Sequence, residues 1–421
     1  MSRAAAGRAR GSSGRGTRID APVIHGLLVL VTLGLVAFGL GMVYSASSAR
    51  AAISAGDPAY YLKRQGLFAV VGLVLFAVLT RVDYRILRRI AGPFLCLSLA
   101  LLALVLVAGD SVNGARRWLV LGPVTVQPSE LAKLALALWV AAFLASKPAP
   151  ASLGALFRPV GLVTGLAGLL VIAEPDLGTA IAFAIVVGAV LLVTGTPLRV
   201  LGLAGGLTMG LVLAVAWMTP YRKARLLSFL NPWADPLDTG HQAVQAQIAL
   251  GSGGLFGTGL GESVQKVYYL PESSTDMIYA IVGEELGLVG ASAVILAYCV
   301  FGYAGFRIAL ATRDPFGKRL AAALTALVCG QAAVNLGAVL GFAPIAGVPL
   351  PFVSYGGSSL IVCLGAVGIL LNIALSDAEA RRATVRDRGR GDGGARAAGS
   401  GRGGRAGDPR RAGELRRATS P

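Results

Sequence analysis

The chain has 421 residues, of which 55% are hydrophobic and only 14% are charged. This composition excludes a water-soluble protein of that length, because several apolar runs approach the roughly 20 residues that cross a bilayer. The net charge of +17 gathers largely in two arginine-rich tails. Without stacking aromatic residues or a nucleic-acid-binding motif, it does not indicate a nucleic-acid partner.

Both tails, residues 1–20 and 377–421, are rich in Gly, Ala, Ser and Arg, so we expect them to be disordered. Their arginines suit anionic membrane lipid at the cytoplasmic face. The apolar run that begins at Pro22 is too long for the core of a signal peptide, so it is predicted to remain as the first span.

Between the tails, residues 21–376 are predicted to form an all-α, polytopic membrane domain of about ten helices. The expected spans are residues 22–44, 66–80, 90–108, 129–146, 159–174, 178–195, 200–218, 276–306, 318–342 and 357–375. The Lys/Arg bias of the short loops places both termini in the cytoplasm. The large loop between the seventh and eighth spans, residues 219–275, is then extracytoplasmic. Its aromatic and apolar content predicts short amphipathic helices on the membrane surface.

Metal and nucleotide sites are not predicted. The four cysteines lie singly inside apolar runs and are interpreted as core residues, and two histidines are too few for a histidine-based metal centre. The Gly-rich stretch 251–261 follows no predicted strand and lacks the Gly-Lys-Ser/Thr ending of a P-loop. Its glycines are expected to allow tight turns.

The first polar cluster on the outer face contains Arg116 and Arg117, followed by Trp118. Two adjacent guanidinium groups match the oxygens of a diphosphate. Alternatively, the arginines extend to the interface beside an anchoring Trp118. The sequence leaves both interpretations open.

At the start of the fourth span, Ser129 is predicted to cap the helix, with Glu130 in its first turn. Capping does not explain Lys133, which follows Glu130 by three residues on the same helix face. Because either charge is costly in lipid, we expect the Glu130–Lys133 pair to face a cavity.

Two further polar stretches lie on the same side. The turn that contains Glu174 and Asp176 is explained by turn chemistry alone, although Asp176 is also a candidate for lining a site. The prolines, glycines and serines of residues 347–359, which include Ser358, predict non-helical backbone at the mouth of the last span. Such backbone is tolerated at membrane depth only inside protein or beside a water-filled cavity.

Asp276 stands where the large loop gives way to an apolar helix, so it is either an N-cap or a functional carboxylate. The cations expected nearby favour function, and they are Arg116, Lys133, Arg222, Arg225 and Lys266. The residues alone therefore predict an outward-facing, basic, acid-containing site for an anionic amphiphile. Glu284 and Glu285, two turns or more further along, are interpreted as packing or ion-pair residues.

In their order along the chain, these motifs resemble the SEDS family (shape, elongation, division and sporulation proteins). The resemblance rests on residues 127–133 (QPSELAK), 175–179 (PDLGT) and 276–287, and it covers nearly the whole membrane domain. It is strongest toward the cell-division branch, with the cell-elongation branch as the alternative. One departure is Ala346, where the family usually has a threonine, so no catalytic role is assigned to it.

The resemblance implies a peptidoglycan glycosyltransferase that polymerises lipid II into β-1,4-linked strands and releases undecaprenyl diphosphate. It implies Asp276 as the essential acid, which we interpret as the general base. The predicted contacts to the headgroup and diphosphate are Arg116, Arg117, Glu130, Lys133, Asp176, Arg222, Arg225, Lys266 and Ser358. No cofactor is identified, and a divalent cation, Mg²⁺ or Mn²⁺, is left open because the sequence shows no ligand set.

The expected partners are a class B penicillin-binding protein, which supplies transpeptidation, and other division proteins at the septum of a bacterial plasma membrane. Two alternative functions remain. A lipid II flippase or other transporter would use Glu130, Lys133 and Glu284 for translocation. A membrane scaffold would recruit division proteins through the arginine-rich tails.

Overall fold

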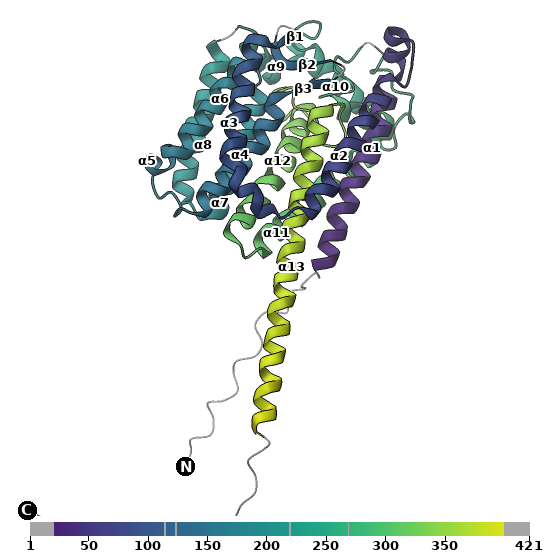
Figure 1. Ribbon diagram of the computed structural model, residues 1–421. Coiled ribbons are helices and arrows are strands. Elements are labelled where there is room, and N and C mark those ends of the chain that lie inside the picture. The colour runs from purple at the N-terminus through teal and green to yellow at the C-terminus, as the bar shows by residue number, and fades with distance from the viewer. Residues whose placement is uncertain (1–20, 113–114, 123, 219, 268, 400–421) are drawn as a thin grey trace, which may run out of the picture. The chain divides into compact units, whose positions relative to one another are not determined.

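The structure, a computed structural model, describes residues 21–399 except residues 113–114, 123, 219 and 268. Ten helices in that part of the chain are long and apolar enough to cross a membrane, which confirms the predicted polytopic all-α architecture. Figure 1 shows their arrangement. The elements are α1 (Ala21–Ala55), α2 (Tyr60–Arg81), α3 (Tyr84–Ala108), β1 (Asp110–Val112), β2 (Ala115–Leu121), β3 (Val124–Val126), α4 (Pro128–Ala145), α5 (Leu153–Leu156), the π-helical turn η1 (Phe157–Gly161), α6 (Leu162–Ala173), α7 (Leu177–Thr194), α8 (Leu198–Met218), α9 (Pro220–Leu230), the 3-10 turn η2 (Pro232–Ala234), α10 (His241–Ser252), α11 (Ile278–Ala311), α12 (Pro315–Val339) and α13 (Gly357–Gly399).

The loop between α3 and α4 folds as a small antiparallel sheet, which the prediction of helical spans and loops did not include. β2 lies in the middle, and β1 and β3 pair with its two edges. The strands have three, seven and three residues, so they do not stand out beside long apolar spans. Figure 1 shows the sheet at the same end of the bundle as α9 and α10, the short helices predicted for the large loop.

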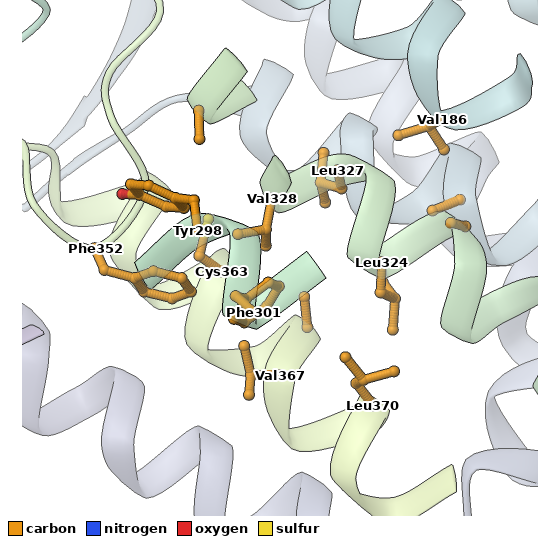
Figure 2. Packing of buried hydrophobic residues seen from close by; sticks show 14 of the residues in the cluster. Val186, Tyr298, Phe301, Leu324, Leu327, Val328, Phe352, Cys363, Val367 and Leu370 are labelled. Atoms are coloured by element: carbon orange, nitrogen blue, oxygen red, sulfur yellow. The ribbon is translucent and has the colours of Figure 1, made fainter. Parts of the chain in front are cut away.

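Buried apolar side chains from α7, α11, α12 and α13 meet in the centre of the bundle (Figure 2). Phe301 of α11 lies against Phe352 of the loop before α13, with ring centroids 6.0 Å apart. Small residues on α12 allow close packing, as they commonly do between membrane helices. Cys363 belongs to this core as predicted, whereas Cys96 and Cys299 are exposed on their helices and contradict the prediction.

α11, expected as one continuous helix, is interrupted at Gly287, whose φ of 64° and ψ of −163° lie outside the helical region. The Gly-rich stretch of the large loop binds the backbone groups that this break releases. Thr258 donates to the Glu284 carbonyl at 3.0 Å, and Leu288 donates to the Gly254 carbonyl at 2.9 Å. The loop therefore supplies hydrogen-bond partners to the backbone groups at the break in α11. Irregular backbone is tolerated at membrane depth where protein surrounds it in this way.

The basic C-terminal segment, expected to be disordered, continues α13 as a helix to Gly399. Within the described residues, the chain from Ala378 on belongs to a unit separate from the preceding residues. Extending an existing helix adds a hydrogen bond per residue without a new nucleation step, which explains the helical backbone beyond the last span. The predicted tail at residues 1–20 lies outside the described residues, as do residues 400–421.

Candidate active site

A cavity of about 2520 Å³ opens among the sheet, the helices α6 to α9 and the loop between α12 and α13. Its wall along α6, α7 and α8 is largely apolar and includes several glycines. Most of the polar lining comes from elements at the sheet end of the bundle (Figure 1). It includes Arg117, Gln127, Arg225, Gln242, Glu272, Asp276, Ser358 and Ser359, with Thr and Tyr hydroxyls beside them, and Arg158 of η1 also lines the cavity.

Asp276 is half-buried and does not cap the helix that follows it. α11 begins at Ile278, and Met277 occupies the N-cap position without a side-chain hydrogen bond. The Asp276 carboxylate accepts one long hydrogen bond, 3.4 Å, from the Thr275 hydroxyl. The interpretation of Asp276 as an N-cap is therefore wrong, and its carboxylate faces the cavity.

Burial raises the pKa of Asp276 to about 7, and the nearby Glu272 carboxylate acts in the same direction. Arg225 opposes them by favouring the ionised form. A carboxyl group that titrates near neutral pH can accept a proton from a hydroxyl group more readily than an ordinary aspartate does. The electrostatics of this position suit a general base.

The loop between α12 and α13 forms the cavity wall beside Asp276, and it has the non-helical backbone that the sequence predicted. Asn335 of α12 ties this loop to the acid, because its amide donates to the carbonyls of Asp276 and Val348, both at 2.7 Å. At Gly347, φ is +67°, and a methyl group there would lie 4.0 Å from Asp276 Oδ2. Glycine thus suits the left-handed backbone conformation at this position next to the carboxylate.

Arg116 and Arg117 are neighbours in β2, so their side chains leave the strand on opposite faces. Arg117 lines the cavity and holds the α6–α7 turn, where Nε donates to the Glu174 carbonyl at 2.9 Å and Nη2 donates to the Pro175 carbonyl. Arg116 is exposed and donates to two carbonyls at the end of α3. The structure does not bring the two arginines together as one clamp.

In the α6–α7 turn, Asp176 is a buried helix cap. It accepts from the Thr179 amide at 3.0 Å and from the Thr179 hydroxyl at 2.8 Å, and it does not line the cavity. Glu174 is fully buried, and neither carboxyl oxygen has a hydrogen-bond partner among the described residues. Burial, aided by Asp176 and opposed by Arg117, raises the pKa of Glu174 to about 8.

Glu130 and Lys133 are each 2% exposed and form the predicted ion pair, with 2.8 Å between Lys133 Nζ and Glu130 Oε1. Lys133 also donates to Gln331 Oε1 on α12 at 3.0 Å. The pair joins α4 to α12 and lies outside the cavity lining. The pair is therefore a buried structural contact, and the expectation that it faces a cavity is wrong for the cavity lined by Asp276.

The helix that carries this pair does not use Ser129 as its cap. α4 begins at Pro128, Gln127 takes the N-cap position, and the buried Ser129 hydroxyl has no partner among the described residues. Proline is favoured at the first helical position, which moves the cap one residue earlier than predicted. The prediction of a Ser129 cap is wrong for that reason.

Lys266 also lies outside the cavity lining. Its Nζ is 2.8 Å from Glu285 Oε1, and the Ser45 hydroxyl of α1 donates to the same carboxylate. Glu284 accepts hydrogen bonds from Ser263 and from the Val264 amide. The interpretation of Glu285 as an ion-pair residue is confirmed, and Lys266 is its partner.

Of the remaining predicted contacts, Arg225 and Ser358 line the cavity. The Ser358 hydroxyl accepts from the Gln127 amide at 3.2 Å and donates to the Thr125 carbonyl at 3.4 Å, which joins α13 to the sheet. Arg222 belongs to α9, but its side chain lies outside the described part of the structure. The structure thus gathers Arg117, Arg225 and Ser358 around one cavity with Asp276.

Sequence reasoning missed Glu272, Gln127 and Asn335. Glu272 precedes Asp276 by four residues, and a second carboxyl group so close in sequence was the available signal. Asn335 is a polar residue inside an apolar span, one turn after Gln331, and such a position is costly unless the side-chain amide finds hydrogen-bond partners. Gln127 carried no signal of its own.

For a metal ion, the described residues offer no group of three or more His, Cys, Asp and Glu side chains. The residues present around the cavity therefore do not make a metal site by themselves.

Comparison with known proteins shows similarity over most of the chain. Residues 25–379 match the cell cycle protein family FtsW/RodA/SpoVE. The probable peptidoglycan glycosyltransferase FtsW of Geobacter sulfurreducens is 41% identical over 351 residues, which cover 83% of this chain and 94% of the relative. The stage V sporulation protein E of Bacillus subtilis is 41% identical over 357 residues, with coverage of 83% and 96%.

Solved structures are similar as well. A chain from a peptidoglycan synthase complex, studied for the coordination of polymerization and crosslinking, superimposes with a TM-score of 0.70 at 32% identity. That match covers 83% of this chain and 97% of the other. The rod shape determining protein RodA of Thermus thermophilus gives a TM-score of 0.62 at 30% identity, covering 86% and 99%.

Proposed function

Because this chain belongs to the FtsW/RodA/SpoVE cell cycle protein family, a group of multi-pass membrane proteins, we propose that it is a peptidoglycan glycosyltransferase that polymerises lipid II. One observation carries the assignment of its site. Asp276 caps no helix, has a raised pKa and faces a cavity that it shares with Arg117 and Arg225. A carboxylate base beside two cations is what glycosyl transfer from a diphosphate requires.

In the proposed reaction, Asp276 accepts the proton of the 4-hydroxyl group of one lipid II sugar. The freed oxygen attacks the anomeric carbon of a second lipid II from the face opposite its diphosphate. The bond between that carbon and the diphosphate oxygen breaks, so the α linkage becomes a β-1,4 linkage and undecaprenyl diphosphate leaves with the electron pair. Arg117 and Arg225 line the cavity where they would stabilise the charge of that leaving group.

The shape and lining of the cavity support a substrate with a polar head and a long apolar tail. The wall along α6 to α8 is largely apolar. Gly161, Gly165 and Gly168 line it at intervals of about one helical turn, which leaves a smooth surface for an isoprenoid chain. A cavity of about 2520 Å³ exceeds the usual size of a small-molecule pocket.

A divalent cation, Mg²⁺ or Mn²⁺, enters the proposal only as an ion that arrives with the diphosphate of the substrate. Such ions often bind through substrate phosphates rather than through a protein cage.

We further propose that the protein works in cell division at the septum, with both termini in the cytoplasm and the cavity open to the outer face. The relatives named FtsW support the division role, and the Lys/Arg bias of the loops supports the orientation. A similar chain is part of a peptidoglycan synthase complex, which supports a partner that crosslinks the strands, here a class B penicillin-binding protein. Other division proteins and anionic membrane lipid complete the proposed partners.

The test uses the full-length protein in proteoliposomes supplied with purified lipid II on one side. Glycan strands should form, and Asp276→Asn should reduce their rate by about 10²- to 10⁴-fold, the range typical for loss of a general base. Movement of lipid II without strand formation would instead support a flippase. Normal polymerisation by the Asn variant would contradict the role of Asp276.

A further inference from the structure

An unused carboxyl group belongs to the α6–α7 turn whose main chain is bound by Arg117 of the cavity wall. Glu174 has no exposed surface, and neither of its carboxyl oxygens has a hydrogen-bond partner in the part of the chain that the structure describes. An unpaired buried carboxyl group destabilises a fold. The mechanism described above does not use it.

Arg117 touches both this turn and the cavity. Its Nε and Nη2 groups donate to the main-chain carbonyls of Glu174 and Pro175, and the same side chain lines the cavity. A guanidinium group has five N–H donors in a planar fork, so two bonds to the turn leave donors for a ligand. The carboxyl group of Glu174 belongs to the residue whose carbonyl already binds Arg117, so its carboxylate is a local competitor for the same guanidinium group.

We propose that Glu174 is a positioning residue whose protonation controls how much of the Arg117 charge is available to a prenyl-linked diphosphate in the cavity. When Glu174 is protonated, it is neutral and Arg117 presents its full charge to the diphosphate. When Glu174 is ionised, it pairs with Arg117 and repels the diphosphate. The inference rests on the proposed function, which supplies the diphosphate.

The charged groups that act on Glu174 come from two directions. Within the described residues they are Asp176, at the start of α7, and Arg117, from β2. Burial is the largest influence and raises the pKa of Glu174 to about 8. The affinity for the diphosphate should therefore be highest below that pH. Above it, the Kd should rise by at most about tenfold per pH unit, as expected for a single linked proton.

The two carboxyl groups then have opposite requirements. Asp276 must be ionised to act as a base, and its pKa is about 7. Glu174 must be protonated, and its pKa is about 8. Polymerisation should show a narrow, bell-shaped pH profile whose rising side reports Asp276 and whose falling side reports Glu174.

Binding of farnesyl diphosphate to the purified full-length protein in detergent micelles tests the switch without any glycosyl transfer. The Kd of the wild-type protein should rise as the pH increases from 7 to 9. Glu174→Gln, which cannot ionise, should lose the part of this rise centred near pH 8 and keep only the smaller rise near pH 7 that comes from ionisation of Asp276 in the same cavity. In polymerisation with lipid II, the KM of the wild-type protein should rise at high pH. The Glu174→Gln substitution should remove this rise and leave kcat unchanged.

Two arginine variants provide a matched pair, because Arg116 and Arg117 are adjacent in β2 and only Arg117 touches the turn. Arg117→Met should weaken binding and remove the rise in Kd centred near pH 8, whereas Arg116→Met should keep the wild-type dependence. A wild-type Kd that stays constant between pH 7 and 9 would overturn the switch, as would a Glu174→Gln variant that titrates like the wild type. Failure of the wild-type protein to polymerise lipid II would count against the proposed function instead.

Discussion

Asp176 and Asp276 each precede an apolar helix, and the fold uses the two carboxylates in opposite ways. Asp176, before α7, is buried and accepts two hydrogen bonds from Thr179. Asp276, before α11, caps nothing because the helix starts two residues later with Met277 at the cap position. The comparison teaches that the hydrogen-bond partners of a carboxylate, rather than its place before a helix, separate a structural acid from a functional one.

The buried glutamates extend the same distinction. Glu130 and Glu285 each have a lysine partner at 2.8 Å inside the protein, and neither lines the cavity. In this peptidoglycan glycosyltransferase, these ion-paired acids hold helices together. Among the described residues, Asp276, whose carboxylate accepts a single long hydrogen bond, lines the cavity, whereas the unpaired Glu174 is buried outside its lining.

Removing the partner of a buried acid should produce the largest change in stability. Lys133→Met leaves the Glu130 carboxylate buried without its cation, which should lower the free energy of unfolding by about 3–5 kcal/mol. Thermal unfolding in detergent, followed by tryptophan fluorescence, measures the loss.

A double variant, Glu130→Leu with Lys133→Met, is the matched control for that prediction. Replacing both charges with apolar side chains avoids an unpaired buried charge, so most of the stability should return. If Lys133→Met unfolds at the wild-type temperature, Lys133 does not stabilise the bundle. The ion pair with Lys133 would then not explain why Glu130 is a structural acid.

Substitutions of Asp176 and Asp276 should change stability by less than Lys133→Met does. Asp176→Ala should cost about 1 kcal/mol of stability through loss of the α7 cap, and Asp176→Asn should cost little because asparagine also caps helices well. Asp276→Ala should unfold like the wild type and yet polymerise poorly. Thermal unfolding and the polymerisation assay, applied to all three variants, check the comparison directly. Equal losses of stability at positions 176 and 276 would break it.

The smallest expected effects are shifts in the pH–rate profile when charged residues near Asp276 are replaced. Glu272→Gln removes the carboxylate that helps to raise its pKa, so the rising side of the pH–rate profile should move to lower pH by a fraction of a unit. Arg225→Gln removes a cation that favours the ionised form, so that side should move to higher pH. Shifts in the same direction for both variants would contradict the assigned causes.

The sequence by itself was sufficient for the ten spans, the short helices of the large loop and Asp276 as the candidate acid. Hydropathy is a local property that about 20 consecutive residues report together, so a span can be recognised without knowing its neighbours. The Glu130–Lys133 pair was also predictable, because a spacing of three residues places both side chains on one helix face.

Only the tertiary structure decided what each polar residue does. The sequence could not tell Asp176 from Asp276, since both precede an apolar helix, and it could not separate Arg116 from Arg117 without the strand that points them apart. The partners that settle these roles are distant in the chain: Ser45 binds Glu285, and Asn335 binds the main chain of Asp276. A buried polar group must find its hydrogen bonds wherever the packed helices supply them, and that supply exists only once the bundle has formed.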